Sequence, residues 1–123
     1  MNVTRIYTGD DGRSHFEDLR MPLTGTQFGR MSKRIPVAHA QFRETDPSYS
    51  LDFHTAPTRQ FVLTLAGAVE IETGDGTVRR LGPGSILLAE DTTGQGHISR
   101  EVEGPRITVF LPVPEDLDIS GWR

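Results

Sequence analysis

Glycine- and proline-rich turns interrupt this chain at close intervals, and this spacing limits most strongly what the chain can fold into. Gly67, Gly74-Asp75-Gly76 and Gly82-Pro83-Gly84 follow one another between residues 67 and 84. Asp-Gly accepts the positive φ angles of tight β-turns. The apolar runs between these turns are too short for amphipathic helices. The sequence therefore predicts an all-β protein whose short antiparallel strands are joined by tight turns.

Alternation of apolar and polar residues predicts the individual strands. The strongest pattern spans residues 60–66, where Gln60, Val62 and Thr64 share one face and Phe61 and its alternate neighbours share the other. Gly67 is expected to end this strand in a hairpin. Further strands are predicted at residues 37–42, 51–54, 68–72, 78–81, 85–89 and 107–111, with another beginning at His97.

The first third of the chain shows no sustained periodicity, although Phe16, Leu19 and Phe28 give it apolar side chains to bury. We expect residues 1–35 to form an N-terminal arm with short strands, packed on the barrel or on a partner subunit. The strand-rich domain is predicted over residues 36–113, and residues 114–123 form a C-terminal tail. A length of 123 residues suits a single compact domain.

Composition excludes several classes of site and partner. The chain contains no cysteine, so disulfides, thiolate metal sites and cysteine nucleophiles are excluded. Its net charge of -4 argues against general nucleic-acid binding, which needs a basic face. No apolar run approaches the length that crosses a bilayer, and the N-terminus has no signal-peptide pattern. We therefore expect a cytoplasmic protein that binds neither nucleic acid nor membrane.

The order of histidine, glutamine and glycine from residue 54 onward resembles the cupin family. The first cupin motif reads His-x-His, three or four residues, Glu, six residues, Gly; here it reads His54-Thr55-Ala56, then Gln60, then Gly67. The second motif, a Pro-Gly turn followed by a histidine, is matched by Pro83-Gly84 and His97. The resemblance implies a double-stranded β-helix, or jelly-roll barrel, with the arm attached. It also implies a homodimer.

The same resemblance implies a divalent metal, Mn, Fe, Ni or Zn, on His54, Gln60 and His97. Such a centre would polarise a carbonyl or hydroxyl for lyase, isomerase or dioxygenase chemistry. The chain departs from the family at Ala56, which replaces the second histidine, and at Gln60, which replaces a carboxylate. Each lost ligand or charge weakens metal affinity. His39 lies on the preceding predicted strand, but its spacing does not identify it as a ligand.

Two alternatives to a metal enzyme stay open. The first is a metal-free module that binds or senses a small polar metabolite, with His54, Gln60, Thr64 and His97 as ligand-binding residues. In that case His54 is expected to hydrogen-bond Gln60 or His97. The second alternative is a structural dimer with a vestigial cavity.

Three residues or segments near this pattern carry lesser expectations. The loop over residues 92–96 is interpreted either as a mobile cap of the barrel mouth or as a flexible connection. Arg59 points away from Gln60 by alternation and is expected in a surface or interface salt bridge. His15, in the arm, has no predicted partner.

Overall fold

The computed structural model describes residues 1–123 and confirms the all-β prediction. Ten strands are followed by one 3-10 turn. The elements are β1 Asn2–Thr8, β2 Ser14–Arg20, β3 Thr24–Thr26, β4 Gly29–Met31, β5 Gln41–Thr45, β6 Ser50–His54, β7 Gln60–Glu72, β8 Val78–Leu81, β9 Ile86–Ala89, β10 His97–Pro112 and η1 Ser120–Trp122. No helical segment is long and apolar enough to cross a bilayer.

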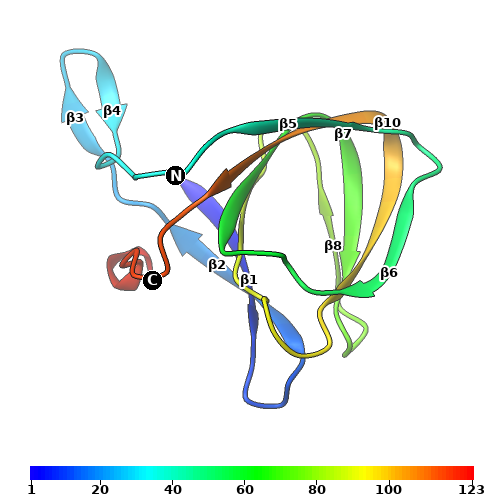
Figure 1. The fold of residues 1–123 in the computed structure, drawn as a ribbon. Helices are drawn as coiled ribbons and strands as arrows, with labels where there is room; N and C mark the ends of the chain where they lie inside the picture. The colour runs from blue at the N-terminus through cyan, green and yellow to red at the C-terminus, as the bar shows by residue number, and fades with distance from the viewer.

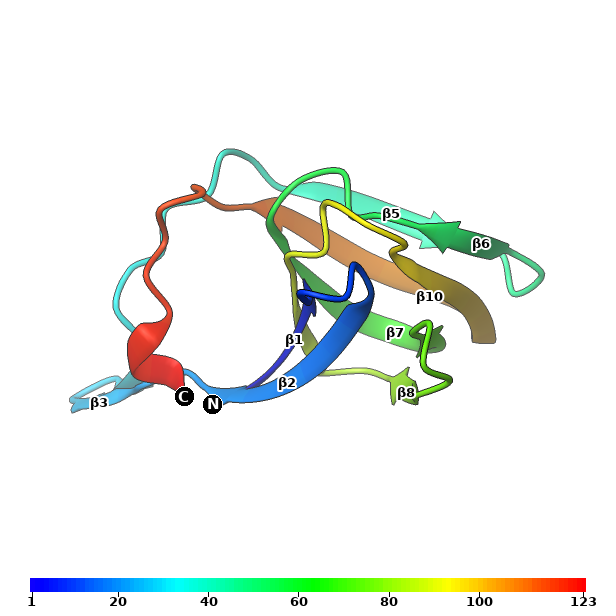
Figure 2. The same ribbon diagram turned by 90° about the horizontal axis from the view of Figure 1, so that it is seen from below.

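Eight of the strands form one mixed sheet in the order β2-β1-β9-β7-β10-β5, with β6 beside β10 and β8 beside β7. The β1 and β9 strands pair in parallel, and the other pairings in this sheet are antiparallel. The sheet curves strongly, so that β5, β6 and β10 face β1, β2 and β8 across the molecule (Figure 2). Its strand order ends at β2 and β5 without closing.

The β7 and β10 strands are long enough for each to pair with two partners along one edge. The first half of β7 pairs with β9 and the second half with β8. Likewise, β10 pairs with β6 near its start and with β5 near its end. The β7 and β10 strands, which pair with each other, therefore link β8 and β9 on one side to β5 and β6 on the other.

The hairpin predicted at Gly67 is wrong, because β7 continues through this residue. Gly67 has a φ of 73°, and a Cβ atom there would lie 2.6 Å from the Glu103 carbonyl oxygen. The register between β7 and β10 also shifts between Glu101 and Ile107. Gly67 thus permits a close approach of two irregular strands, where the sequence pattern had indicated a chain reversal.

The N-terminal arm has two structurally different parts. The β1 and β2 strands belong to the main sheet and bury Val3, Ile6 and Leu19 in the core. In contrast, β3 and β4 form a separate two-stranded hairpin that projects from the molecule (Figure 1). Phe28, expected to be buried, lies in this hairpin with 82% of its surface exposed. The predicted homodimer stays a prediction.

Two apolar clusters form the core and fix the chain ends and the central strands. The first contains Val3, Leu19, Phe61 and Trp122, and the Trp122 ring stacks on Phe61 with the ring centroids 6.2 Å apart. The predicted tail is thereby anchored through η1. The second cluster surrounds Ala56 with the side chains of Ile6, Val69, Ile71, Leu81, Leu87 and Ala89.

Candidate functional site

Strand pairing brings two of the predicted site histidines together. His54 ends β6, His97 begins β10, and the two residues are cross-strand partners. Their ring centroids lie 4.5 Å apart with the ring planes inclined by 59°. Directly opposite residues on adjacent strands place their side chains in contact, so this register alone forms the pair.

Gly96 makes the register possible. Its φ is 74°, and a Cβ atom there would lie 2.0 Å from the His54 carbonyl oxygen. Only glycine combines this conformation with such a close approach. The residue before His97 therefore fixes where β10 meets β6.

The loop that precedes Gly96 is held against the β1–β2 turn. The Thr8 hydroxyl donates to the Thr93 carbonyl oxygen at 3.0 Å, and the Gln95 N–H donates to the Gly12 carbonyl oxygen at 2.9 Å. A Cβ atom on Gly94 would lie 2.3 Å from that same Gly12 oxygen. The loop glycines thus permit close contact with a neighbouring turn, and the two expected roles, a mobile cap or a flexible connection, stay predictions.

His97 is oriented by a buried carboxylate that the sequence did not single out. Asp91 is fully buried, and its Oδ2 lies 2.5 Å from His97 Nδ1 and 2.6 Å from the Ser14 hydroxyl oxygen. A carboxylate can only accept, so Ser14 and His97 Nδ1 both donate to it. His97 Nε2 is left free for another partner. An aspartate that holds the imidazole in this way is the usual means of preparing a histidine for proton transfer.

His54 is oriented by the backbone. Its Nδ1 lies 2.8 Å from the Asp52 carbonyl oxygen, which can only accept, so its Nε2 is also free. The expected hydrogen bonds from His54 to Gln60 or His97 are not formed. Burial lowers the pKa of His54, and Arg43 acts in the same direction, while the bond to Asp52 opposes the shift. The ring is therefore predominantly neutral at neutral pH.

Both histidines line an inner cavity of about 390 Å³. Gln60, 5% exposed, lines the same cavity, so the structure brings together three of the four predicted ligand-binding residues. Thr64 is buried but does not line the cavity. Of the other two histidines, His39 is exposed, and His15 Nε2 lies 2.9 Å from Asp11 at the surface.

Two arginines in the cavity wall were missed from the sequence. Arg43 on β5 and Arg106 on β10 line the cavity beside Tyr49 and Phe110. Arg43 lies over the Phe110 ring, with its guanidinium carbon 4.8 Å from the ring centroid. Alternation on β5 places Arg43 on the same face as Gln41, and this was the only available signal.

The residues around the histidines make an incomplete metal-binding set. Two imidazoles and two neutral amides, Gln41 and Gln60, line the cavity, and no group of three or more His, Cys, Asp or Glu side chains is placed to hold a metal ion. Catalytic metal centres usually have three strong protein ligands. The neighbouring guanidinium groups also disfavour a divalent cation. Metal binding at His54, Gln60 and His97 therefore stays a prediction.

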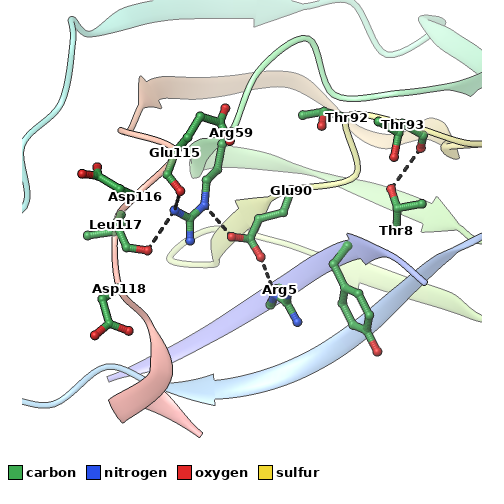
Figure 3. Close-up of a pocket in the computed structure, with 11 residues that line it drawn as sticks. Arg5, Thr8, Arg59, Glu90, Thr92, Thr93, Glu115, Asp116, Leu117 and Asp118 are labelled. Carbon is green, nitrogen blue, oxygen red and sulfur yellow. Dashed lines mark hydrogen bonds and ion pairs between the residues drawn. The ribbon is translucent and has the colours of Figure 1, made fainter. Parts of the chain in front are cut away.

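A second, more open hollow lies outside the sheet between β1, the loop after β9 and the C-terminal segment (Figure 3). Arg59, only 7% exposed, crosses its wall. The Arg59 Nε donates to Glu90, which also accepts from Arg5, and the Arg59 Nη1 lies within 3.1 Å of the carbonyl oxygens of Pro114, Glu115 and Leu117. Arg59 does form the predicted salt bridge, but a buried one that fastens the tail. Although this hollow is larger, at about 630 Å³, it contains none of the predicted site residues.

The comparisons with known proteins identify no family for this chain. No family model matches the sequence, and no curated protein matches it. One similar solved structure is that of protein NMB1881 from Neisseria meningitidis, which is 13% identical with a TM-score of 0.47. The match covers 65% of this chain and 84% of the other.

Proposed function

We propose that this chain is a cupin-type protein that binds a small polar metabolite in the inner cavity, where His97 can exchange a proton with it. One observation carries the proposal. His54 and His97 are cross-strand partners with both Nδ1 atoms engaged, so two oriented imidazole Nε2 atoms are left for a ligand beside a cavity of about 390 Å³. Cavities of this size commonly hold one small molecule.

The buried carboxylate behind His97 supports proton exchange as part of this function. Asp91 Oδ2 accepts from Ser14 and from His97 Nδ1, so it fixes the orientation of the ring and leaves Nε2 as the atom that can exchange a proton. His54, kept neutral by burial, suits a hydrogen bond to an uncharged polar group of the ligand. The pair thus offers one proton carrier and one neutral contact.

A thermal-shift screen of small polar metabolites tests the proposal, because a ligand of the folded state raises Tm by mass action. Hits are expected to shift wild-type backbone amides around the inner cavity in ¹H–¹⁵N spectra. The His54→Gln variant should lose most of the stabilisation, whereas His39→Gln, at an exposed histidine, should retain it. Hits that act equally on both variants, or that perturb only the outer hollow, would contradict the proposal.

The metal prediction is tested in the same preparation. Elemental analysis of protein purified without a histidine tag measures Mn, Fe, Ni and Zn per chain. Close to one metal per chain, lost in both His54→Ala and His97→Ala, would support a metal centre at this site. Retention of the metal in both variants would place it elsewhere.

A further inference from the structure

The inner cavity has an excess of positive charge in its wall. Arg43 and Arg106 stand on adjacent antiparallel strands, where Arg106 pairs with Thr45 and Arg43 pairs with Thr108. This register places the two arginines diagonally across neighbouring strands on one face, within reach of each other. Both line the cavity.

Only one of the two guanidinium groups has a carboxylate partner. Arg106 Nε lies 3.0 Å from Glu101 Oε2, and both side chains are almost completely buried. Arg43 makes no ion pair and is held instead over the rings of Phe110 and Tyr49. The positive charge of Arg43 in the cavity wall therefore has no ion-pair partner.

Several buried polar atoms at the same place have no hydrogen-bond partner. They are Arg43 Nε, Arg106 Nε, Thr108 Oγ1 and both carboxylate oxygens of Glu101. The Arg106–Glu101 contact is close, but its angles fall outside hydrogen-bond geometry, so it contributes charge attraction alone. Buried polar groups in native proteins nearly always have a partner. Glu101 lies beside Arg106, so the Arg43 guanidinium is the group that has neither an ion-pair partner nor an acceptor for its Nε–H, and an acceptor with negative charge would supply both.

The remaining wall is largely apolar and limits what else the ligand contains. Val62, Ile71, Leu87 and Phe110 also line the cavity. A highly charged ligand would leave these side chains without apolar contacts. One negative group on a mainly apolar body matches both kinds of surface.

We infer that the metabolite is a small organic acid whose carboxylate binds Arg43 and Arg106, while its apolar body lies against Val62 and Leu87. This inference rests on the proposed function, since it assigns the ligand class of the same cavity. Arg43 supplies the unpaired charge, and its planar fork suits a carboxylate.

The test compares acids with their amides of the same shape. Hexanoate and hexanamide, and benzoate and benzamide, are titrated into wild-type protein while ¹H–¹⁵N spectra record the arginine Nε–H signals. Each acid should bind about tenfold or more tightly than its amide, because a charge-assisted hydrogen bond contributes at least that factor. The Nε–H signals of Arg43 and Arg106 should shift.

Matched variants identify the residue responsible. Arg43→Gln should remove the preference for the acid, whereas Arg30→Gln, on the exposed β4 strand, should preserve it. Circular dichroism establishes that each variant is folded, and the wild-type comparison stands without them.

The outcomes separate this inference from the proposed function. Amides that bind the cavity as tightly as the acids would overturn the inference and leave the proposed function standing. Acids that bind wild type and Arg43→Gln equally, with no shift of the Nε–H signals, would overturn it as well. If no acid, amide or screened metabolite perturbs the cavity, both fail together.

Discussion

The outer hollow and the inner cavity use buried arginines in opposite ways. In the hollow, Arg59 donates to Glu90 and to three carbonyl oxygens of the C-terminal segment. In the cavity, Arg43 has no ion-pair partner, and the Nε atoms of Arg43 and Arg106 have no hydrogen-bond partner. A satisfied arginine fastens two parts of one chain together, whereas an unsatisfied one is available to a ligand. We therefore infer that the larger hollow has a structural role and that the smaller cavity is the ligand-binding site.

The largest expected effect is a loss of stability that differs between the two arginines. Arg59→Leu should lower the free energy of unfolding by about 3 kcal/mol, because it leaves three carbonyl oxygens without their donor and leaves Glu90 with Arg5 as its only partner. Arg43→Leu should change it by less than about 1 kcal/mol, since the variant loses only ring contacts with Tyr49 and Phe110 and no ion pair. Urea unfolding measures both. Equal losses in the two variants would show that the cavity arginine is structural as well.

The second effect concerns the backbone that holds the two histidines together. Gly96→Ala should cost about 2 kcal/mol, because alanine strains the positive φ and its Cβ meets the His54 carbonyl oxygen. Gly121→Ala, where no atom lies within 4 Å of the added Cβ, is the matched control, and a cost below about 0.5 kcal/mol is expected. Similar Tm values for the two variants would mean that the β6–β10 register tolerates a side chain at residue 96.

The third effect tests the carboxylate behind His97, whose Oδ2 accepts from Ser14 and His97 while its Oδ1 has no partner. Asp91→Asn should cost about 1–2 kcal/mol and change the tautomer of His97, because an amide accepts less strongly from Ser14 and His97 Nδ1. Asp11→Asn changes an exposed Asp–His pair in the same way and should have a much smaller effect on stability, because solvent screens surface pairs. Nitrogen-15 shifts of the imidazoles report the tautomers. A His97 tautomer that is unchanged in Asp91→Asn would remove Asp91 from its orienting role.

The smallest effect is a pH dependence due to His54. Its pKa in the folded chain lies below the ordinary value of 6.5, so the unfolded chain takes up more protons as the pH falls through that value. The stabilising contribution is therefore present above pH 6.5 and decreases below it. In His54→Gln, the loss of unfolding free energy between pH 7 and pH 5 should be smaller than in wild type. An unchanged slope, with His39→Gln as control, would contradict the shift.

Sequence patterns predicted the strands better than the way in which the strands meet. The strand at residues 78–81 matches β8, because alternation and the flanking turns are local signals. The prediction at residue 67 was wrong because this glycine is required by a close tertiary contact with Glu103 and does not mark a turn. The two strands predicted at residues 60–66 and 68–72 are thus one continuous strand, β7.

The candidate site was predictable only in part for a similar reason. His54, Gln60 and His97 stood out by their order, whereas Asp91, Arg43 and Arg106 became visible only through strand register. A charged residue in a short loop or on a strand is normally solvated, and nothing local distinguishes these three from surface charges. Their burial depends on which distant strands enclose them.

The parallel pairing of β1 with β9 has a consequence for how the chain folds. The β1–β2 hairpin is local and leaves the ribosome early, but the strand that joins it to the sheet, β9, is made more than half a chain later. Contacts of such high sequence separation slow folding, because a long loop must close before they form. The β1–β2 hairpin therefore keeps an unpaired edge until β9 has been synthesised, and its docking on β9 is expected among the late steps of folding.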